Sequence, residues 1–217
     1  MKFERYSFKK KSSQDMIAHS NELMREILKR RSIRDFSSEE IPDMVIKNVL
    51  KTAMAAPSGA NKQPWKFVVV KDENIKRKIR IAAEEEEKKF YEQRATEDWL
   101  KDLNKFGTDW NKPFLEVAPA LIIVFRQSYD NSERGKRKNY YVNESVGIAC
   151  GFLLMALQNA GLVSLTHTPS PMGFLERILK RPKNEKAYLL IPVGFPAKNA
   201  EVPILNKKAY NRSVEVF

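Results

Sequence analysis

Apolar residues recur with helical spacing in two segments near the beginning of the chain. A first helix is predicted over Asn21–Arg30, because four apolar residues fall on one face there: Leu23, Met24, Ile27 and Leu28. A second helix begins near Pro42, which suits a first helical turn, and ends before Pro57. Its apolar stripe consists of Val45, Ile46, Val49, Leu50 and Ala53.

Short apolar, β-branched runs between polar segments predict strands. These runs are Phe67–Val70, Leu121–Phe125, Leu162–Thr166 and Tyr188–Val193. A charged stretch from Ile75 to about Leu103 predicts one long helix, and Phe174–Lys180 predicts a short one. Ser128–Lys138 is polar and predicts a loop, whereas Val202–Phe217 has no clear periodicity.

The segment Glu144–Asn159 is apolar nearly all round, which is typical of a central helix or of a subunit interface. Gly161 is a good terminator for this helix. Cys150 lies in its apolar part and is interpreted as a buried structural thiol. The order of helices and strands predicts an α+β or three-layer α/β domain with four or five strands.

Composition adds limits on the kind of protein. A chain of 217 residues with 42% hydrophobic residues fits one domain with a sizeable core. One cysteine excludes an internal disulfide framework and suits a reducing compartment. No apolar run reaches the roughly 18 residues that a membrane helix needs, so we expect a cytoplasmic protein without a membrane partner.

The net charge of +12 raises the alternative of a basic module that binds nucleic acid or another anion. However, the basic residues are scattered, are not interleaved with aromatic residues in a stacking pattern, and accompany no zinc-ligand spacing. We therefore expect no nucleic-acid partner and no metal. A phosphorylated cofactor would account for part of the charge.

The densest candidate anion site follows the first helix. Arg30, Arg31 and Arg34 place three guanidinium groups within five residues, and Ser32 adds a hydroxyl. Guanidinium groups bind phosphate in a bidentate manner and stay charged. The alternative is a solvated basic end of a helix, which the helix dipole favours in any case.

Two loops add polar groups beside predicted strands. In Pro57–Ala60, Gly59 allows a backbone to approach a flat ligand, and Ser58 supplies a hydroxyl, although a plain turn explains them equally. Thr166, His167 and Thr168 follow a strand, where neutral hydroxyls reach a cofactor ring or merely end the strand. No catalytic triad, P-loop or G-x-G-x-x-G motif occurs, so chemistry here would come from a bound cofactor.

In combination these segments resemble the nitroreductase superfamily, over roughly Leu28 to Lys208. The motifs that carry the resemblance are R-R-S-x-R at Arg30–Arg34, A-P-S-G-A-N-x-Q-P-W at Ala56–Trp65 and V-G-F-P at Val193–Pro196. Further stretches are similar to its iodotyrosine deiodinase branch: Thr52–Ala60, Glu84–Glu87, Ile148–Gly151, Ala156–Val163 and Glu185-Lys186. The resemblance implies an α+β, three-layer fold with a central mixed sheet of four to five strands, in a homodimer with exchanged arms.

The same resemblance implies FMN as the cofactor, bound at the subunit interface. By position, the phosphate and ribityl chain would be held by Arg30, Arg31, Ser32 and Arg34, and Lys207 stands where the family has a further arginine. Pro57 and Ser58 resemble residues along the flavin edge. Thr168, the candidate catalytic residue, resembles the threonine at flavin N5, and Thr166 falls near the same ring.

The deiodinase branch also implies a lid over about residues 84–115, within a single FMN-binding domain of residues 21–217 that follows an extension of residues 1–20. Glu87 and Lys112 resemble groups that bind the ammonium and carboxylate of an amino acid, and Tyr91 resembles a hydrogen-bond donor to it. The Ala60 amide would hold a phenolate. Without the resemblance, Glu87 is one of four consecutive glutamates on a solvated helix.

These implications give FMN-dependent reductive dehalogenation of halogenated tyrosine as the leading functional hypothesis. The alternative within the superfamily is a general nitroreductase or quinone reductase that uses NADH or NADPH. The basic anion-binding or nucleic-acid-binding module remains the alternative from outside the enzymes.

Overall fold

The computed structural model describes residues 2–133 and 135–217 and divides the chain into two compact units, Met1–Arg30 and Arg31–Phe217. The first unit contains helix α1 (Ser13–Leu28). This helix begins at Ser13 rather than at the predicted Asn21, because Ser12 caps it: the Ser12 hydroxyl accepts a hydrogen bond from the Asp15 amide at 3.1 Å. Periodicity of apolar residues did not reveal this polar first half.

The second unit consists of short helices around a sheet. Its helices are α2 (Asp43–Met54), α3 (Glu73–Lys89), α4 (Glu97–Asn104), α5 (Phe114–Val117), α6 (Val142–Asn159) and α7 (Gly173–Ile178). Its strands are β1 (Trp65–Val70), β2 (Ala120–Gln127), β3 (Tyr129–Ser132), β4 (Gly135–Lys138), β5 (Val163–Ser164) and β6 (Glu185–Gly194). Short 3-10 turns at Gly59–Asn61 and Tyr210–Arg212 and a π turn at Phe90–Arg94 complete it.

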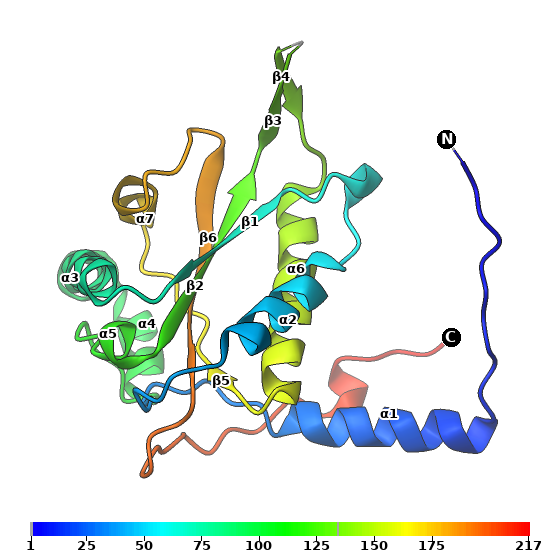
Figure 1. Cartoon of the computed structure of the whole chain (residues 1–217). Helices are drawn as coiled ribbons and strands as arrows, with labels where there is room; N and C mark the ends of the chain where they lie inside the picture. The colour runs from blue at the N-terminus through cyan, green and yellow to red at the C-terminus, as the bar shows by residue number, and fades with distance from the viewer. Residues whose placement is uncertain (1, 134) are drawn as a thin grey trace. The chain divides into compact units, whose positions relative to one another are not determined.

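The central sheet has four strands in the order β1-β2-β6-β5, as the sequence predicted in number. These strands pair antiparallel, and the parallel part of the predicted mixed sheet is a bridge between Ser32 and Ser164. Helices α2 and α6 cover one face, and α3, α5 and α7 cover the other (Figure 1). The unit is thus a three-layer α+β domain.

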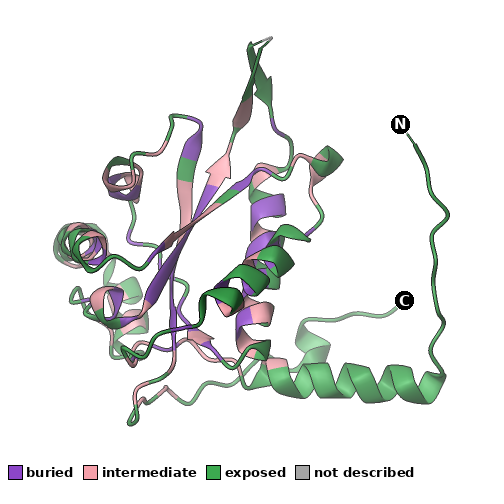
Figure 2. Ribbon diagram, in the orientation of Figure 1, coloured by how far each residue is buried: buried purple, intermediate pink, exposed green. Residues whose placement is uncertain are grey.

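Strand β2 shows why two helical layers are needed. Its residues alternate between the two faces: Ala120, Ile122 and Val124 pack toward α2 and α6, whereas Leu121 and Ile123 pack toward α3. All of them are fully buried, and the buried colour follows β2 and β6 through the middle of the sheet (Figure 2). A strand that is apolar on both faces must be covered on both.

Two sequence predictions about this unit were wrong in detail, and one helix was missed. The expected helix from Ile75 to Leu103 is interrupted by the π turn, after which Ala95 is extended and Thr96 caps α4 by accepting from the Trp99 amide. The polar segment Ser128–Lys138 forms the β3–β4 hairpin instead of a loop. Helix α5 was not predicted, because four residues carry no periodicity.

The predicted strand Leu162–Thr166 is shorter than expected, since its ladder with β6 covers only Val163 and Ser164. The chain returns to β6 at His167, which exchanges two backbone hydrogen bonds with Leu190 at 2.9 and 3.0 Å. This second attachment fixes the segment that carries Thr166 and Thr168.

Helix α6 contains the single cysteine on its buried side. Cys150 is 4% exposed, and burial raises the pKa of its thiol to about 12. The thiol is therefore protonated and unreactive at neutral pH, as the sequence predicted. Within the described residues, no helix is long and apolar enough to cross a membrane.

Candidate active site

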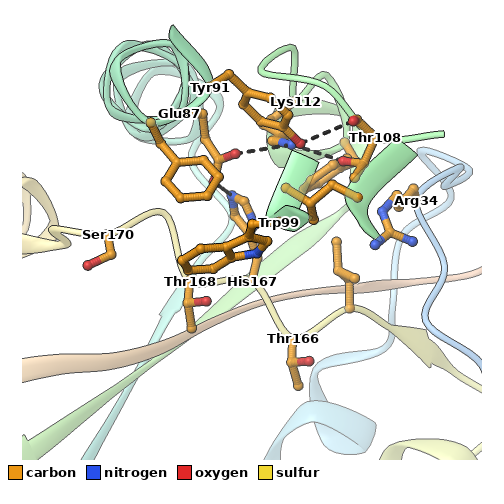
Figure 3. Close-up of a pocket in the computed structure, with 14 residues that line it drawn as sticks. Arg34, Glu87, Tyr91, Trp99, Thr108, Lys112, Thr166, His167, Thr168 and Ser170 are labelled. Atoms are coloured by element: carbon orange, nitrogen blue, oxygen red, sulfur yellow. Dashed lines mark hydrogen bonds and ion pairs between the residues drawn. The ribbon is translucent and has the colours of Figure 1, made fainter. Parts of the chain in front are cut away.

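A cavity of about 320 Å³ lies between the C-terminal end of α3, helix α4 and the segment after β5 (Figure 3). Six residues selected from the sequence line it: Arg34, Glu87, Tyr91, Lys112, Thr166 and Thr168. The remaining lining residues are Phe90, Trp99, Leu103, Thr108, Phe114, Leu165, His167 and Ser170. Residues far apart in the sequence thus form a half-polar, half-apolar pocket.

Helix α3 directs Glu87 into this cavity. Ala83 and Ile79 lie one and two turns earlier on the same face and are fully buried against the core. Glu87 continues their line, so its carboxylate faces inward, whereas the neighbouring Glu85 is exposed. The alternative that Glu87 lies on a solvated helix face does not hold, since its side chain is only 13% exposed.

Lys112 lies beside Glu87, in the segment that precedes α5. The distance from Lys112 Nζ to Glu87 Oε2 is 3.4 Å. Lys112 Nζ also donates to Thr108 Oγ1 at 3.1 Å and to the Asp109 carbonyl, and its backbone amide donates to Glu84 Oε1 at 2.7 Å. The segment before α5 is therefore tied to α3 through both the backbone and the side chain of Lys112.

Both charges of this pair are poorly solvated. Burial raises the pKa of Glu87, against the opposing effect of Lys112, and burial lowers the pKa of Lys112, against the opposing effect of Glu87. Each ionised group therefore depends on the other for its stability in the cavity. A ligand that carried both an anion and a cation could replace both partners at once.

Tyr91 lies on the π turn, four residues after Glu87, and beside the pair of Glu87 and Lys112. Its hydroxyl donates to the Thr108 carbonyl at 3.1 Å, and Lys112 Nζ lies 5.6 Å from the centre of its ring. Burial raises the pKa of Tyr91, so the phenol stays protonated and can donate. Phe90 and Trp99 pack edge to face at 4.8 Å and give this side of the cavity an apolar wall.

The opposite wall comes from the segment after β5. Thr166 and Thr168 are exposed, whereas the intervening His167 is buried and points toward Glu87, with Nε2 at 3.9 Å from Oε1 (Figure 3). Burial, Lys112 and Arg34 together lower the pKa of His167 to about 3. Its imidazole is therefore neutral, and the two threonine hydroxyls remain open to a ligand.

Arg34 lines the cavity from the segment before α2. Its guanidinium is half-buried and makes no hydrogen bond within residues 2–133 and 135–217, and desolvation lowers its pKa. Nearby, Arg31 donates to the Pro203 carbonyl, and Ser32 bridges to Ser164. The predicted anion site therefore contains a partly desolvated cation that forms no ion pair within the described residues, which suits a bound anionic group.

The loop residues selected from the sequence do not line this cavity. Pro57, Ser58 and Ala60 lie between α2 and β1. Ala60 and the following Asn61 have left-handed backbone conformations, with φ values of 50° and 53°. Such strain in residues other than glycine is commonest at functional sites.

A tight contact explains the glycine of this loop. A Cβ atom on Gly59 would lie 2.8 Å from the Tyr141 ring, so no larger residue fits without movement of that ring. The Ser58 hydroxyl accepts from the Gln63 amide at 2.9 Å and holds the loop closed.

Two other candidates are not among the residues that line the cavity. Lys207 is exposed in the tail, and Arg30 ends the first unit. No group of three or more His, Cys, Asp or Glu side chains suited to a metal ion occurs in the described part of the chain.

Sequence reasoning missed several residues that shape the site. Glu84 holds the Lys112 backbone and receives Arg80 Nε at 2.8 Å. The spacing of Arg80 and Glu84 by four residues was a detectable signal of an ion pair on one helix face. Trp99 had no such signal, because its position depends on the π turn that separates α3 from α4.

Residues 27–195 match the Nitroreductase family. This match covers most of the chain, which therefore belongs to that family. The three-layer α+β fold agrees with this assignment.

Two relatives and one solved structure of iodotyrosine deiodinases are similar to this chain. The chain is 59% identical over 196 residues to an iodotyrosine deiodinase of Haliscomenobacter hydrossis, covering 90% of this chain and 88% of the relative. It is 50% identical over 196 residues to human iodotyrosine deiodinase 1, covering 89% of this chain and 68% of the relative. A crystal structure of an oxidised iodotyrosine deiodinase bound to FMN and 3-iodo-L-tyrosine superposes with a TM-score of 0.77 at 33% identity, covering 89% of this chain and all of that one.

Proposed function

We propose that the protein is an FMN-dependent oxidoreductase that removes halide from halogenated tyrosine and releases tyrosine. The observation that carries this proposal is the buried pair of Glu87 and Lys112, 3.4 Å apart in the cavity. An amino acid zwitterion presents an ammonium and a carboxylate at comparable separation. A general nitroreductase substrate carries no such pair of charges. The named relatives support the same activity.

The residues present fit FMN as the cofactor. Its phosphate is an anion, and the half-buried Arg34 guanidinium forms no ion pair among the described residues. Arg31 and Ser32 lie close in sequence and provide further donors, with Arg30 and Lys207 as additional candidate cations. The exposed hydroxyls of Thr166 and Thr168 are available to the ring system.

When bound and reduced, FMN supplies the two electrons that, with one proton, convert a carbon–halogen bond into a carbon–hydrogen bond and a halide ion. The protein's own groups bind and orient the substrate. Glu87 accepts hydrogen bonds from the ammonium, Lys112 pairs with the carboxylate, and the Tyr91 hydroxyl donates to it. The apolar wall of Phe90 and Trp99 excludes water and so strengthens these charge pairs.

The phenol end of the substrate needs a separate donor, which we assign to the Ala60 amide. Within the described residues this amide makes no hydrogen bond, and its strained loop holds it in an uncommon conformation. Because Pro57, Ser58 and Ala60 do not line the cavity of their own chain, we infer that a second copy of the chain brings them there. The complete site then requires a homodimer.

Helix α6 supports the dimer. Ile148, Phe152 and Met155 recur on one helix face and are 43%, 37% and 41% exposed, although large apolar side chains favour burial. The opposite side of α6 packs against α2 and the sheet. The exposed stripe is thus available to a second copy. We further expect a cytoplasmic protein without nucleic-acid partners.

The decisive experiment measures iodide release from 3-iodo-L-tyrosine by the FMN-loaded protein reduced with dithionite. We expect stoichiometric iodide and tyrosine, and no release by protein stripped of FMN. A nitroaromatic substrate with NADH or NADPH is assayed in parallel. Turnover of the nitroaromatic without iodide release would favour the general nitroreductase and refute the proposal.

A further inference from the structure

His167 lies directly behind the carboxylate that we assign to the substrate ammonium. Its side chain is 10% exposed, and its Nε2 atom is buried without a hydrogen-bond partner among the described residues. That atom lies 3.9 Å from Glu87 Oε1. An unpaired polar atom in a native interior calls for an explanation, because its burial without a hydrogen-bond partner is unfavourable.

The backbone and ring of His167 are held firmly. The residue is bonded to Leu190 of β6 through both its amide and its carbonyl. The imidazole packs edge to face on Phe114, with ring centres 5.5 Å apart. Nε2 is therefore a fixed point on the sheet side of the cavity, whereas Glu87 belongs to the helical side.

The two oxygens of Glu87 have different neighbours. Oε2 faces Lys112, and Oε1 faces His167. If Nε2 carried a lone pair, it would face a carboxylate oxygen that also carries lone pairs, which is unfavourable. The tautomer with hydrogen on Nε2 instead points a donor at the carboxylate. A closure of about 1 Å would bring the two atoms to the 2.7–2.9 Å of a charge-assisted hydrogen bond.

Ligand binding would make the His167 donor more important to Glu87. If Lys112 turns to the carboxylate of an amino acid, Glu87 loses its cationic partner and is left with the ligand ammonium. His167 then remains as a donor from the protein for this carboxylate. Because the pKa of His167 is about 3, the imidazole is neutral and leaves the negative charge of Glu87 undiminished for the ammonium.

We propose that His167 is a positioning residue for ammonium recognition: its Nε2–H group donates to Oε1 of Glu87 when an amino acid is bound and fixes the orientation of that carboxylate. This inference rests on the proposed function, since it assumes that Glu87 binds a substrate ammonium. It predicts a preference for ligands with a free amino group over ligands that lack it.

The test compares His167→Gln, whose side-chain amide keeps a donor near Nε2, with His167→Phe, which keeps a ring on Phe114 and removes the donor. Each FMN-loaded protein is titrated with 3-iodo-L-tyrosine and with 3-(4-hydroxy-3-iodophenyl)propanoic acid, which lacks the amino group. We expect His167→Phe to weaken 3-iodo-L-tyrosine binding about tenfold, as for loss of a hydrogen bond to a charged group. Binding of the propanoic acid should change little, and His167→Gln should stay near wild type.

A double variant separates positioning from a general structural effect. In a Glu87→Gln background, His167→Phe should cause little further loss, because the two residues act as one unit. Equal losses for both ligands, additive losses in the double variant, or a His167→Gln protein as weak as His167→Phe would each overturn the inference. Wild-type protein that fails to bind 3-iodo-L-tyrosine would overturn the proposed function as well.

A second measurement does not depend on turnover. The chain has two histidines, so the imidazole signals in nitrogen-15 spectra of tag-free protein come from His167 and His19 alone, and His167→Gln identifies those of His167. We expect the neutral Nε2–H tautomer at pH 7, with its proton shifted downfield when 3-iodo-L-tyrosine binds. Protonation at Nδ1 instead would refute the proposal.

Discussion

Replacing Glu87 by Gln removes one charge from the cavity and preserves the shape of the side chain. In the free protein this carboxylate lies 3.4 Å from Lys112 Nζ and is 13% exposed. The gross attraction between two unit charges at this separation is about 5 kcal/mol at an effective dielectric constant near 20. Desolvation of both groups offsets much of it, as the pKa directions of Glu87 and Lys112 show.

The loss of affinity can be derived from the hydrogen bond that disappears. An ammonium bound to a carboxylate gains roughly 1.5–3 kcal/mol from the charge-assisted bond, so Glu87→Gln should weaken 3-iodo-L-tyrosine binding by about 10- to 150-fold. Lys112 retains Thr108 Oγ1 and the Asp109 carbonyl as acceptors, so the lid should remain folded. FMN affinity should be unchanged, since Arg34 and the threonines are not touched.

The assay is titration of the oxidised FMN-loaded protein with 3-iodo-L-tyrosine, followed by the change in flavin fluorescence. Glu85→Gln is the matched control: it removes the same charge from the same helix at an exposed position. Iodophenol, which lacks both amino acid charges, should bind weakly and equally to all three proteins. If Glu87→Gln binds 3-iodo-L-tyrosine as tightly as Glu85→Gln does, the assignment of the ammonium site is wrong.

Three further predictions concern other parts of the molecule. Arg34→Ala should weaken FMN binding by about 2 kcal/mol, which is the low end for a charge pair because the guanidinium is half-exposed. Riboflavin, which lacks the phosphate, should lose less affinity. Equal losses for the two ligands by calorimetry would contradict a phosphate contact. Phe152→Asp should shift the mass in light scattering from dimer to monomer with loss of bound flavin, and a flavin-loaded monomer would refute the interface. The pKa of His167, which faces Glu87, Lys112 and Arg34, falls from 6.5 in the unfolded chain to about 3, so its contribution to stability is present above pH 6.5 and is lost as the pH falls toward 3. The free energy of unfolding in urea should therefore fall between pH 7 and pH 4.5 by about 2–3 kcal/mol more in wild type than in His167→Gln. An equal fall in both proteins would count against a buried neutral imidazole.

Much of the fold follows from local pattern. The sequence predicted α2, β2 and β6 because burial leaves a recognisable pattern of apolar residues. A helix buried on one face shows apolar residues at helical spacing, and a strand buried on both faces shows a continuous apolar run. The ends of helices were harder to predict from the sequence where polar side chains or local backbone geometry determine them. The start of α1 depends on a Ser12 cap, and the end of α3 depends on a π turn, and neither alters the spacing of apolar residues.

The types of side chain in the site were evident from the sequence, since the motifs around Arg34, Ala60 and Thr168 occur in an order and at a spacing that resemble one family. Glu87 is a less direct case. Within a run of four glutamates, its four-residue spacing from Ala83 and Ile79 predicts an inward-facing position, and the burial of those two residues in the core turns its carboxylate inward.

Only the tertiary structure decided the partnerships. The contact of Glu87 with Lys112 joins residues twenty-five positions apart, and His167 reaches the same carboxylate because β5 and β6 hold it at the edge of the sheet. Such contacts depend on how the helices cover the sheet, and that arrangement is stabilised by packing throughout the hydrophobic core. The sequence by itself determined which chemical groups are available, and the packing of the layers determined which of them meet.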